Sequence, residues 1–259
     1  MIQHVATNER KVLRTLAVTE LGPPIGSGLR ANVHALADGR AVKIFRGSRK
    51  LHRVAREFDV TRAARAAGAA AWRVDEIVRV EGRLAIVGER VCGETYADAL
   101  RAGRVSIRQA LDALVAAHRT IADLGVPPEA AGVARPLART IGPSPVDPLL
   151  MERRGFGHGD LSLENLMIDA EGRTTILDWG SAGYGPLLAD ITVANRALRR
   201  TLLHRRTPLR LRMAAPAIVL AHRYLAFRAL GLPVTSFVLL SPAWSPLARR
   251  RPKAANVSV

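Results

Sequence analysis

The chain has 259 residues, of which 48% are hydrophobic and 4% aromatic, so it is not a disordered protein and can form one large domain or two lobes. A single cysteine, Cys92, excludes an internal disulfide framework. The net charge of +17 comes with no nucleic-acid-binding signature and few aromatic residues for base stacking, so we expect no nucleic-acid partner.

The N-terminal third reads as a small sheet with one helix. From Glu20 to Phe45 the pattern is strand, glycine-containing turn, strand, tight turn, strand, and Asp38-Gly39 between two alternating apolar runs predicts a hairpin. The stretch from Arg49 to Ala67 predicts a helix that ends before Gly68. A second hairpin is predicted around Glu81-Gly82.

The rest of the chain is predicted to be mostly helical. Gly93 separates the sheet region from helical sequence, and Ser106 is the expected cap of an amphipathic helix that runs to Leu124. Residues 125–157 are rich in Pro and Gly, and we expect only short helical pieces there. A third hairpin is predicted within residues 166–180, before an Arg-rich helical remainder.

Three polar residues lie around the third predicted hairpin. Asn165 precedes its first strand and Asp178 ends its second, so pairing of the strands brings both side chains to one end of the ribbon. Asp160 lies on the loop that leads into the first strand. Oxygen ligands of this kind suit Mg²⁺, which takes one or two protein oxygens together with phosphate and water. Taken singly, the same residues could be a helix cap and turn residues.

The spacing of these residues resembles that of the protein-kinase-like superfamily. His158-Gly159-Asp160, four further residues and Asn165 match its catalytic loop, and Asp178-Trp179-Gly180 begins 13 positions later, as in its metal-binding loop. The resemblance implies that Asp160 is the catalytic residue, which orients the acceptor hydroxyl and takes its proton. It also implies that Asn165 and Asp178 hold Mg²⁺ and that His158 braces the loop.

The N-terminal part resembles the nucleotide-binding elements of the same superfamily. Gly26, Ser27 and Gly28 match the glycine loop, with Ala in place of its third glycine, although a glycine-containing hairpin turn would give the same pattern. Lys43, on the third predicted strand, matches the lysine that contacts phosphate. A lysine on a buried strand needs a partner, and Glu57 in the predicted helix is the expected one.

A segment between the two parts resembles the hinge of these kinases. Backbone groups near Glu89 and Val91 would bind the purine edge of ATP or GTP. The implied fold is α+β and two-lobed, with a small antiparallel-sheet, nucleotide-binding N-lobe that contains one helix (residues 1–91). A mostly helical catalytic and acceptor-binding C-lobe (residues 92–259) would follow, and the two would meet near Cys92.

Three departures set the sequence apart from protein kinases. Gly159 stands where the catalytic loop usually has Arg, and Ser162 stands where protein Ser/Thr kinases have Lys. Only 12 positions separate Asp178 from Asp190, which leaves no room for an activation segment. These stretches look like those of the aminoglycoside phosphotransferase and small-molecule kinase family. That family implies Mg-dependent transfer of the γ-phosphate to a hydroxyl of a small molecule, with Asp190 as a brace of the catalytic loop.

The charge distribution argues against a polycationic acceptor. After Asp190 the chain has 13 Lys and Arg but no Asp or Glu, and residues 125–157 offer only Glu129, Asp147 and Glu152. Because like charges repel, we expect a neutral or anionic natural product such as a nucleoside antibiotic, in a self-resistance role. The alternatives are a metabolic sugar or amino-alcohol kinase, an aminoglycoside O-phosphotransferase, or a lipid or protein kinase that docks through its basic helices. Since 35 of the 39 Lys and Arg residues are Arg, codon bias is an equally good source of the charge.

Two features bear on membranes and location. The N-terminal segment carries Glu9, Arg10 and Lys11 where a signal peptide needs an apolar core. The longest uncharged stretch, near the C-terminus, is interrupted by Pro233 and Pro242. We therefore expect a cytoplasmic protein without stable membrane insertion, which the single cysteine also fits.

Overall fold

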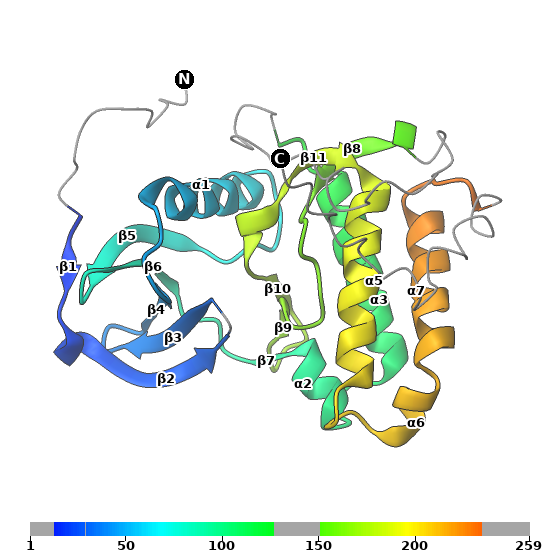
Figure 1. Ribbon diagram of the computed structural model, residues 1–259, viewed down its shortest axis with the longest axis horizontal. Coiled ribbons are helices and arrows are strands. Elements are labelled where there is room, and N and C mark those ends of the chain that lie inside the picture. The colour runs from blue at the N-terminus through cyan, green and yellow to red at the C-terminus, as the bar shows by residue number, and fades with distance from the viewer. Residues whose placement is uncertain (1–12, 29, 127–150, 235–259) are drawn as a thin grey trace, which may run out of the picture.

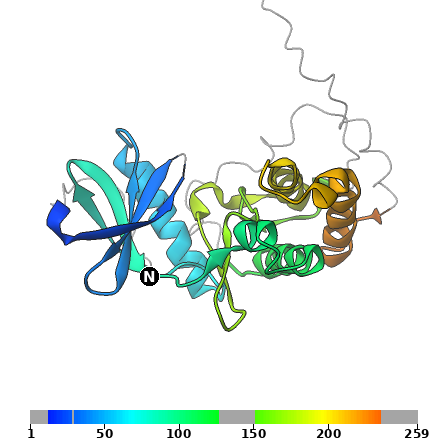
Figure 2. The ribbon, with the colours of Figure 1, turned by 90° about the horizontal axis from the view of Figure 1, so that it is seen from below.

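The computed structural model describes residues 13–28, 30–126 and 151–234. Figure 1 shows a β-sheet with one helix at one end of the molecule and a group of helices at the other, with short strands between them. Figure 2, seen from below, shows the same two parts side by side. The predicted α+β class, with an antiparallel-rich sheet first and helices later, is confirmed. The division at residue 91 stays a prediction.

The N-terminal sheet has six strands in the order β1-β5-β6-β4-β3-β2. β1 pairs in parallel with β5, and the other neighbouring pairs of this sheet are antiparallel. Helix α1 (Leu51–Ala66) packs on β5 and β6. The strands are β1 (Thr15–Leu16), β2 (Leu21–Ser27), β3 (Ala31–Leu36), β4 (Arg40–Phe45), β5 (Val74–Val80) and β6 (Arg83–Glu89), with a 3-10 turn, η1 (Val18–Glu20), after β1.

Strand alternation in β4 decides which side chains face the helix. Val42 and Ile44 lie in one apolar cluster, whereas Phe45 lies in another, together with Phe58 of α1. Because successive side chains of a strand point to opposite faces, Lys43 shares the face of Phe45. The sequence of β4 thus places a lysine on the side of the sheet that α1 covers.

The three predicted hairpins are present. Asp38-Gly39 joins β3 to β4, and Glu81-Gly82 joins β5 to β6. The third hairpin pairs β9 (Leu166–Ile168) with β10 (Thr174–Ile176). One detail of the prediction is wrong: because the short strand β1 precedes the others, Lys43 lies on the fourth strand and not the third.

The C-terminal part is built around three packed helices, α3, α5 and α7. Ser106 caps α3 as predicted, since its hydroxyl accepts from Gln109 N while the Gln109 side chain accepts from Ser106 N. The helices are α2 (Tyr96–Arg101), α3 (Ile107–Ala122), α5 (Leu187–Leu203), α6 (Leu209–Met213) and α7 (Ala215–Ala229), with a 3-10 turn, η3 (Trp179–Ser181), after β10. β7 (Glu94–Thr95) extends the third hairpin.

The expectation of only short helical pieces in residues 125–157 is wrong at the end of that segment. There β8 (Arg154–Gly157) pairs with β11 (Gly183–Pro186). Phe156 of β8 is buried, and its ring centroid lies 6.2 Å from that of Trp179. These Gly-rich strands lack the alternation by which a strand is recognised in sequence. Residues 127–150, with Glu129 and Asp147, lie outside the described residues. Within the described ranges, no helix is long and apolar enough to span a bilayer.

Candidate active site

A largely buried cluster of charges joins the sheet to the loop after β10. Lys43 Nζ lies 2.7 Å from Glu57 Oε1 and 3.3 Å from Asp178 Oδ1. Lys43 comes from β4 and Glu57 from α1, while Asp178 follows β10. The side chains of Lys43 and Glu57 are 14% and 13% exposed, and that of Asp178 is 35% exposed. The predicted partners Lys43 and Glu57 are therefore together, and Asp178 joins them.

The cluster keeps Lys43 and Asp178 charged. Burial opposes the charge of Lys43, but the carboxylates of Glu57 and Asp178 outweigh it and raise the pKa of the ammonium. Burial also opposes the charge of Asp178, but Lys43, together with His158 and Arg30, outweighs it, so the pKa of that carboxyl lies below its ordinary value. Either charge would be far more costly at this depth without its partner.

Hydrogen bonds hold Asp160 and Asn165 beside the end of the third hairpin. Leu177 N donates to Asn165 O at 2.9 Å, next to Asp178. Asn165 Nδ2 donates to Asp160 O at 2.8 Å, which leaves the amide oxygen of Asn165 as an acceptor. Asp178 has a left-handed backbone (φ 59°, ψ 59°), an uncommon conformation for a residue other than glycine. The hairpin thus brings the three predicted residues to one end, although their roles stay predictions.

Asp160 has the electrostatic character of a proton acceptor. Burial, followed by the carboxylate of Asp178, raises the pKa of Asp160 above its ordinary value. His158 and, less strongly, Arg30, between β2 and β3, and Arg200, on α5, act in the opposite direction. A carboxylate whose pKa is raised takes a proton more readily, which suits a general base.

Buried side chains brace the loop that carries Asp160. Gly159 N donates to Asp190 Oδ1 at 2.6 Å, and His118 Nδ1 lies 3.2 Å from Asp190 Oδ2. Burial alone would raise the pKa of Asp190, but the hydrogen bond and charge of His118, the charge of His158 and the hydrogen bond from Gly159 together outweigh it, and the pKa lies below its ordinary value. His158 Nε2 donates to Leu177 O at 2.9 Å, which ties the loop to the residue before Asp178. His158 and Asp190 therefore act as braces, as predicted.

The departure from the protein-kinase pattern at position 159 has a steric cause. Gly159 has φ +73°, and a Cβ atom there would lie 2.2 Å from Ser181 O. We expect Gly159→Ala to lower the free energy of unfolding by about 3 kcal/mol or more, because the left-handed conformation and the contact with a backbone oxygen both cost energy. Urea unfolding measures the loss.

Gly172→Ala is the matched control for this prediction. Gly172 has φ +78°, but its Cβ position has no neighbour within 4 Å. This variant should lose only about 1–2 kcal/mol, the cost of the backbone conformation alone. Equal losses in the two variants would contradict a steric requirement at position 159.

The predicted glycine loop lies at the end of β2 and in the turn to β3. Gly26 pairs with Val33, and Gly28 N donates to Ala31 O at 2.9 Å. Arg46 Nη2 donates to Ser27 Oγ at 2.9 Å and to Asn32 Oδ1 at 2.7 Å. The side chain of Arg46 thus fastens the two strands of this loop to each other.

The predicted hinge begins where β6 ends. Glu89 N donates to Arg73 O at 2.9 Å, and Glu89 O accepts from Trp72 Nε1 at 2.7 Å. Val91 is partly buried against the apolar cluster that contains Phe45 and Trp72. Both backbone groups of Glu89 therefore already have partners within the protein, which the sequence did not predict.

The chain is similar to known proteins in part of its sequence and in its fold. Residues 146–225 match the model of the phosphotransferase enzyme family, whereas no curated protein matches the chain. The solved structure of aminoglycoside phosphotransferase APH(3'')-Id from Streptomyces rimosus superposes with a TM-score of 0.53 and 18% identity, over 82% of this chain and 93% of that chain. The chain has the aminoglycoside phosphotransferase fold.

Two further structures with this fold are similar to the chain. APH(3'')-Id from Streptomyces rimosus in complex with ADP and streptomycin has a TM-score of 0.50 and 17% identity, over 82% of this chain and 92% of that chain. An aminoglycoside-3'-phosphotransferase of type VIII has a TM-score of 0.50 and 18% identity, over 83% of this chain and 91% of that chain. The family match and the shared fold together support a small-molecule phosphotransferase.

The donor set of this phosphotransferase fold suits Mg²⁺. The Asp178 carboxylate is partly exposed and the Asn165 amide oxygen is left as an acceptor, so two hard oxygen ligands are present. Among the described residues, no group of three or more His, Cys, Asp or Glu side chains could hold a metal ion. Since Mg²⁺ takes one or two protein oxygens, phosphate and water would complete its coordination. Held by Asn165 and Asp178, the ion would supply charge neutralisation for the phosphates of a nucleotide.

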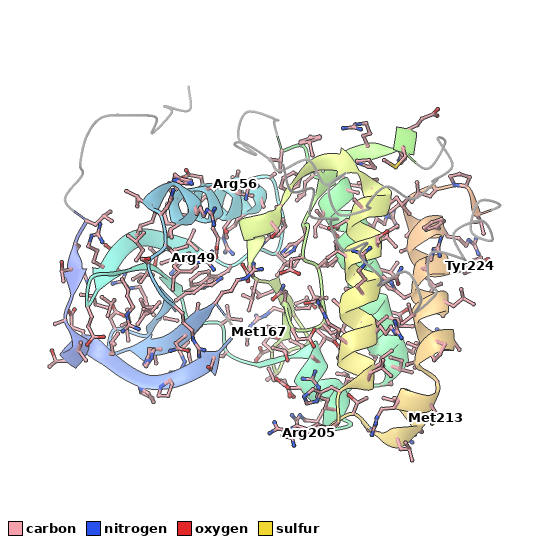
Figure 3. All side chains as sticks on the ribbon, viewed as in Figure 1. Arg49, Arg56, Met167, Arg205, Met213 and Tyr224 are labelled. Atoms are coloured by element: carbon pink, nitrogen blue, oxygen red, sulfur yellow. The ribbon has the colours of Figure 1, made fainter. Side chains whose placement is uncertain are left out.

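Two residues that support the site were not predicted from the sequence. They are Arg56, on α1, and Trp72, in the segment before β5. Arg56 of α1 donates to the carbonyl oxygens of Gly180 and Ala182, which anchors the turn after Asp178 (Figure 3). Trp72 donates to the hinge carbonyl of Glu89. No local pattern distinguishes Arg56 from its arginine neighbours, since its partners lie more than 120 positions away.

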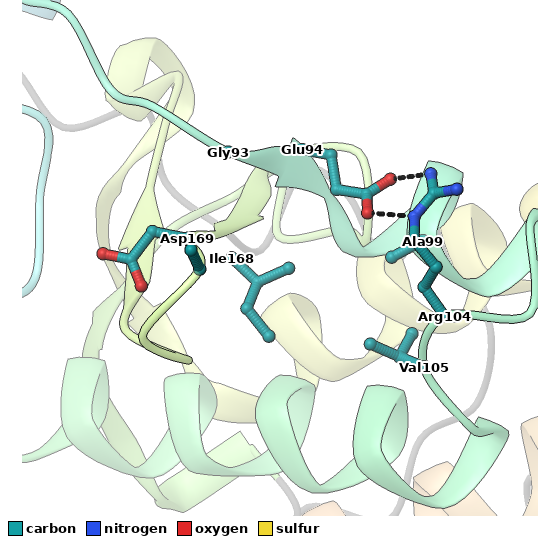
Figure 4. Close-up of a pocket in the computed structure, with 8 residues that line it drawn as sticks. Gly93, Glu94, Ala99, Arg104, Val105, Ile168 and Asp169 are labelled. Atoms are coloured by element: carbon teal, nitrogen blue, oxygen red, sulfur yellow. Dashed lines mark hydrogen bonds and ion pairs between the residues drawn. The ribbon is translucent and has the colours of Figure 1, made fainter.

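A cavity of about 310 Å³ lies apart from this site, lined by residues of β7, of α2 and the turn after it, and of the end of β9 (Figure 4). Glu94 and Arg104 form a bidentate ion pair at its edge, and Asp169 accepts hydrogen bonds from Glu171 N and Arg173 N. The charged groups that line the cavity are thus already paired, and none of the predicted site residues lines it.

Proposed function

We propose that the protein transfers the γ-phosphoryl group of ATP or GTP to a hydroxyl of a small molecule. The observation that carries this proposal is the ion pairing of Lys43 with both Glu57 and Asp178, next to the loop that holds Asp160 and Asn165. An ammonium fixed between two carboxylates is suited to bind phosphate oxygens without moving.

Each side chain has one part in the proposed transfer. Asp160 would orient the acceptor hydroxyl and take its proton as the oxygen bonds to the γ-phosphorus, while the bond to the β-phosphate oxygen breaks and the nucleoside diphosphate leaves. Lys43 would bind the phosphates, held in place by Glu57. Asn165 and Asp178 would hold Mg²⁺, and Gly26, Ser27 and Gly28 would cover the phosphates. We further propose that residues 1–91 form the nucleotide-binding N-lobe and residues 92–259 the catalytic C-lobe. The proposed location of the enzyme is the cytoplasm.

The acceptor is proposed to be neutral or anionic. Arg30 and Arg200 contribute a positive field at Asp160, where the acceptor hydroxyl would lie, although the carboxylate of Asp178, which Mg²⁺ would neutralise, has the larger single effect there. Glu152 is exposed on the stretch before β8, and it is the one acidic residue of positions 125–157 that falls in the described ranges. A nucleoside antibiotic or another hydroxylated natural product fits this field, with self-resistance as the proposed role. A sugar or amino-alcohol kinase is the second candidate, and an aminoglycoside kinase is favoured only by the similar structures.

We expect no useful phosphorylation of polycationic acceptors. Each pair of like charges about 4 Å apart costs about 1 kcal/mol in water and about 4 kcal/mol near a protein surface. An acceptor with several ammonium groups would therefore bind poorly near these arginines. A screen of nucleotide consumption with cationic, neutral and anionic hydroxyl compounds at equal concentration tests this. Efficient turnover of a polyamine sugar would contradict the proposed acceptor charge and leave the kinase proposal intact.

A further inference from the structure

The short segment between α1 and β5 connects the hinge with the strand that leads to Asp178. On one side, Ile176 N donates to Ala70 O at 2.7 Å and Trp72 N donates to Ile176 O at 3.1 Å. On the other side, Glu89 N donates to Arg73 O at 2.9 Å. The segment is therefore fixed between β10 and the end of β6, and it holds the Trp72 side chain at the hinge.

The indole of Trp72 is locked in place against the hinge. Its Nε1 donates to Glu89 O at 2.7 Å, and the residue is only 9% exposed. A Cβ atom at Gly88 would lie 2.9 Å from Trp72 Cε2 and Cζ2 and 2.2 Å from Arg73 O. Only glycine at position 88 leaves room for this indole edge, so the bond to the Glu89 carbonyl is built into the fold.

We propose that Trp72 weakens the base selectivity of the nucleotide site by donating a hydrogen bond to the Glu89 carbonyl oxygen, which leaves that oxygen one of its two lone pairs. This inference rests on the proposed function and on the hinge expected from the sequence, where backbone groups near Glu89 and Val91 would bind the purine. Ala41, two residues before Lys43 on β4, pairs with Gly88, so the start of the hinge lies on the strand pair that carries the phosphate-binding lysine. The residue that controls the hinge carbonyl is thus close to where a purine attached to those phosphates would lie.

The two purines differ in what they present to a carbonyl. Adenine offers its 6-amino group as a donor, whereas guanine offers a 6-oxo acceptor, which a free carbonyl repels. A carbonyl that already accepts a hydrogen bond from the indole gains less from the adenine amino group. The same indole N–H is a donor that guanine can share. Trp72 therefore narrows the difference between ATP and GTP, and both nucleotides serve as donors.

Calorimetric titration of the wild-type protein with three Mg-nucleotides gives the first test. We expect the Kd values of ATP and GTP to differ by less than about tenfold, and removal of the 6-amino group, in purine riboside triphosphate, to cost less than about threefold. A Kd that rises tenfold or more when the 6-amino group is absent would overturn the proposal. This measurement uses the wild-type protein alone, so it does not depend on the folding of a variant.

Trp72→Phe gives the second test. The variant keeps a ring but loses the N–H, so the Kd ratio should shift toward ATP by about 3- to 10-fold, and the penalty for the missing 6-amino group should grow by the same factor. Trp179→Phe is the matched control, because Trp179 Nε1 also donates to a backbone carbonyl, that of Ile176, at 3.0 Å. It should change both affinities together and leave the ratio as it was.

The outcomes separate this inference from the proposed function. An unchanged ATP:GTP ratio in folded Trp72→Phe, or an equal shift in Trp179→Phe, would overturn the role of Trp72 while nucleotide binding persists. If wild-type protein binds neither nucleotide at millimolar concentration, the proposed function itself fails, and the inference fails with it.

Discussion

Asp160→Asn is expected to lower kcat by about 10²- to 10⁴-fold while leaving the Kd of the Mg-nucleotide close to the wild-type value. The amide keeps the size of the carboxylate but cannot take the acceptor proton. The raised pKa of Asp160, caused by burial and then by Asp178, shows that the environment of this carboxyl favours proton uptake. Single-turnover rates with an active acceptor, combined with calorimetric titration of nucleotide, measure the two quantities separately.

Glu164→Gln is the control for this substitution. Glu164 lies on the same loop, and its Oε1 accepts from Thr201 Oγ1 at 2.7 Å and from Arg101 Nη2 at 3.1 Å. Glutamine can still accept these hydrogen bonds, so kcat should stay within about threefold of wild type. If Asp160→Asn were no slower than Glu164→Gln, Asp160 would not be the base.

Asp178→Ala is expected to abolish Mg-dependent nucleotide binding. The substitution removes one of the two proposed metal ligands and one of the two carboxylates that Lys43 contacts, at 3.3 Å. Phosphate charge would then lack its counter-ion, so the Kd of nucleotide should no longer improve when Mg²⁺ is added. Titration of the variant with nucleotide, with and without Mg²⁺, measures this without any need for turnover.

Glu171→Ala supplies the comparison for Asp178→Ala. Glu171 lies in the turn of the same hairpin, is 62% exposed and pairs with Arg173 at 3.0 Å. Loss of an exposed ion pair costs little, so Mg-dependent binding should be unchanged in this variant. Wild-type Mg-dependence in Asp178→Ala would remove Asp178 from the metal site.

Much of the placement of the candidate site residues could be predicted because they lie on or beside regular local structure. Alternation in β4 places Lys43 on the face that α1 covers, and a buried lysine requires a partner such as Glu57. Pairing of β9 with β10 brings Asn165, which precedes β9, into a backbone hydrogen bond with Leu177, the neighbour of Asp178. In each case a period-two pattern or a turn fixes which residues meet.

The parts that could not be predicted depend on contacts between distant segments. Trp72 reaches the hinge because its segment is bonded to β10, more than 100 positions later, and nothing in its local sequence indicates this. The β8–β11 pair was missed because its glycines erase the alternation that marks a strand. The steric need for Gly159 also depends on Ser181, which the fold and not the local sequence brings close.

The most direct test of the proposed function is the transfer of the phosphoryl group itself. Wild-type protein is incubated with Mg²⁺, γ-labelled ATP or GTP, and a pool of neutral and anionic hydroxylated natural products, and mass spectrometry then identifies labelled compounds. We expect one labelled phosphate monoester to accumulate with wild-type protein and with Glu164→Gln, but not with Asp160→Asn. Equal label in acceptors with wild-type protein and Asp160→Asn, or no labelled acceptor together with no nucleotide binding, would contradict the proposed phosphotransferase.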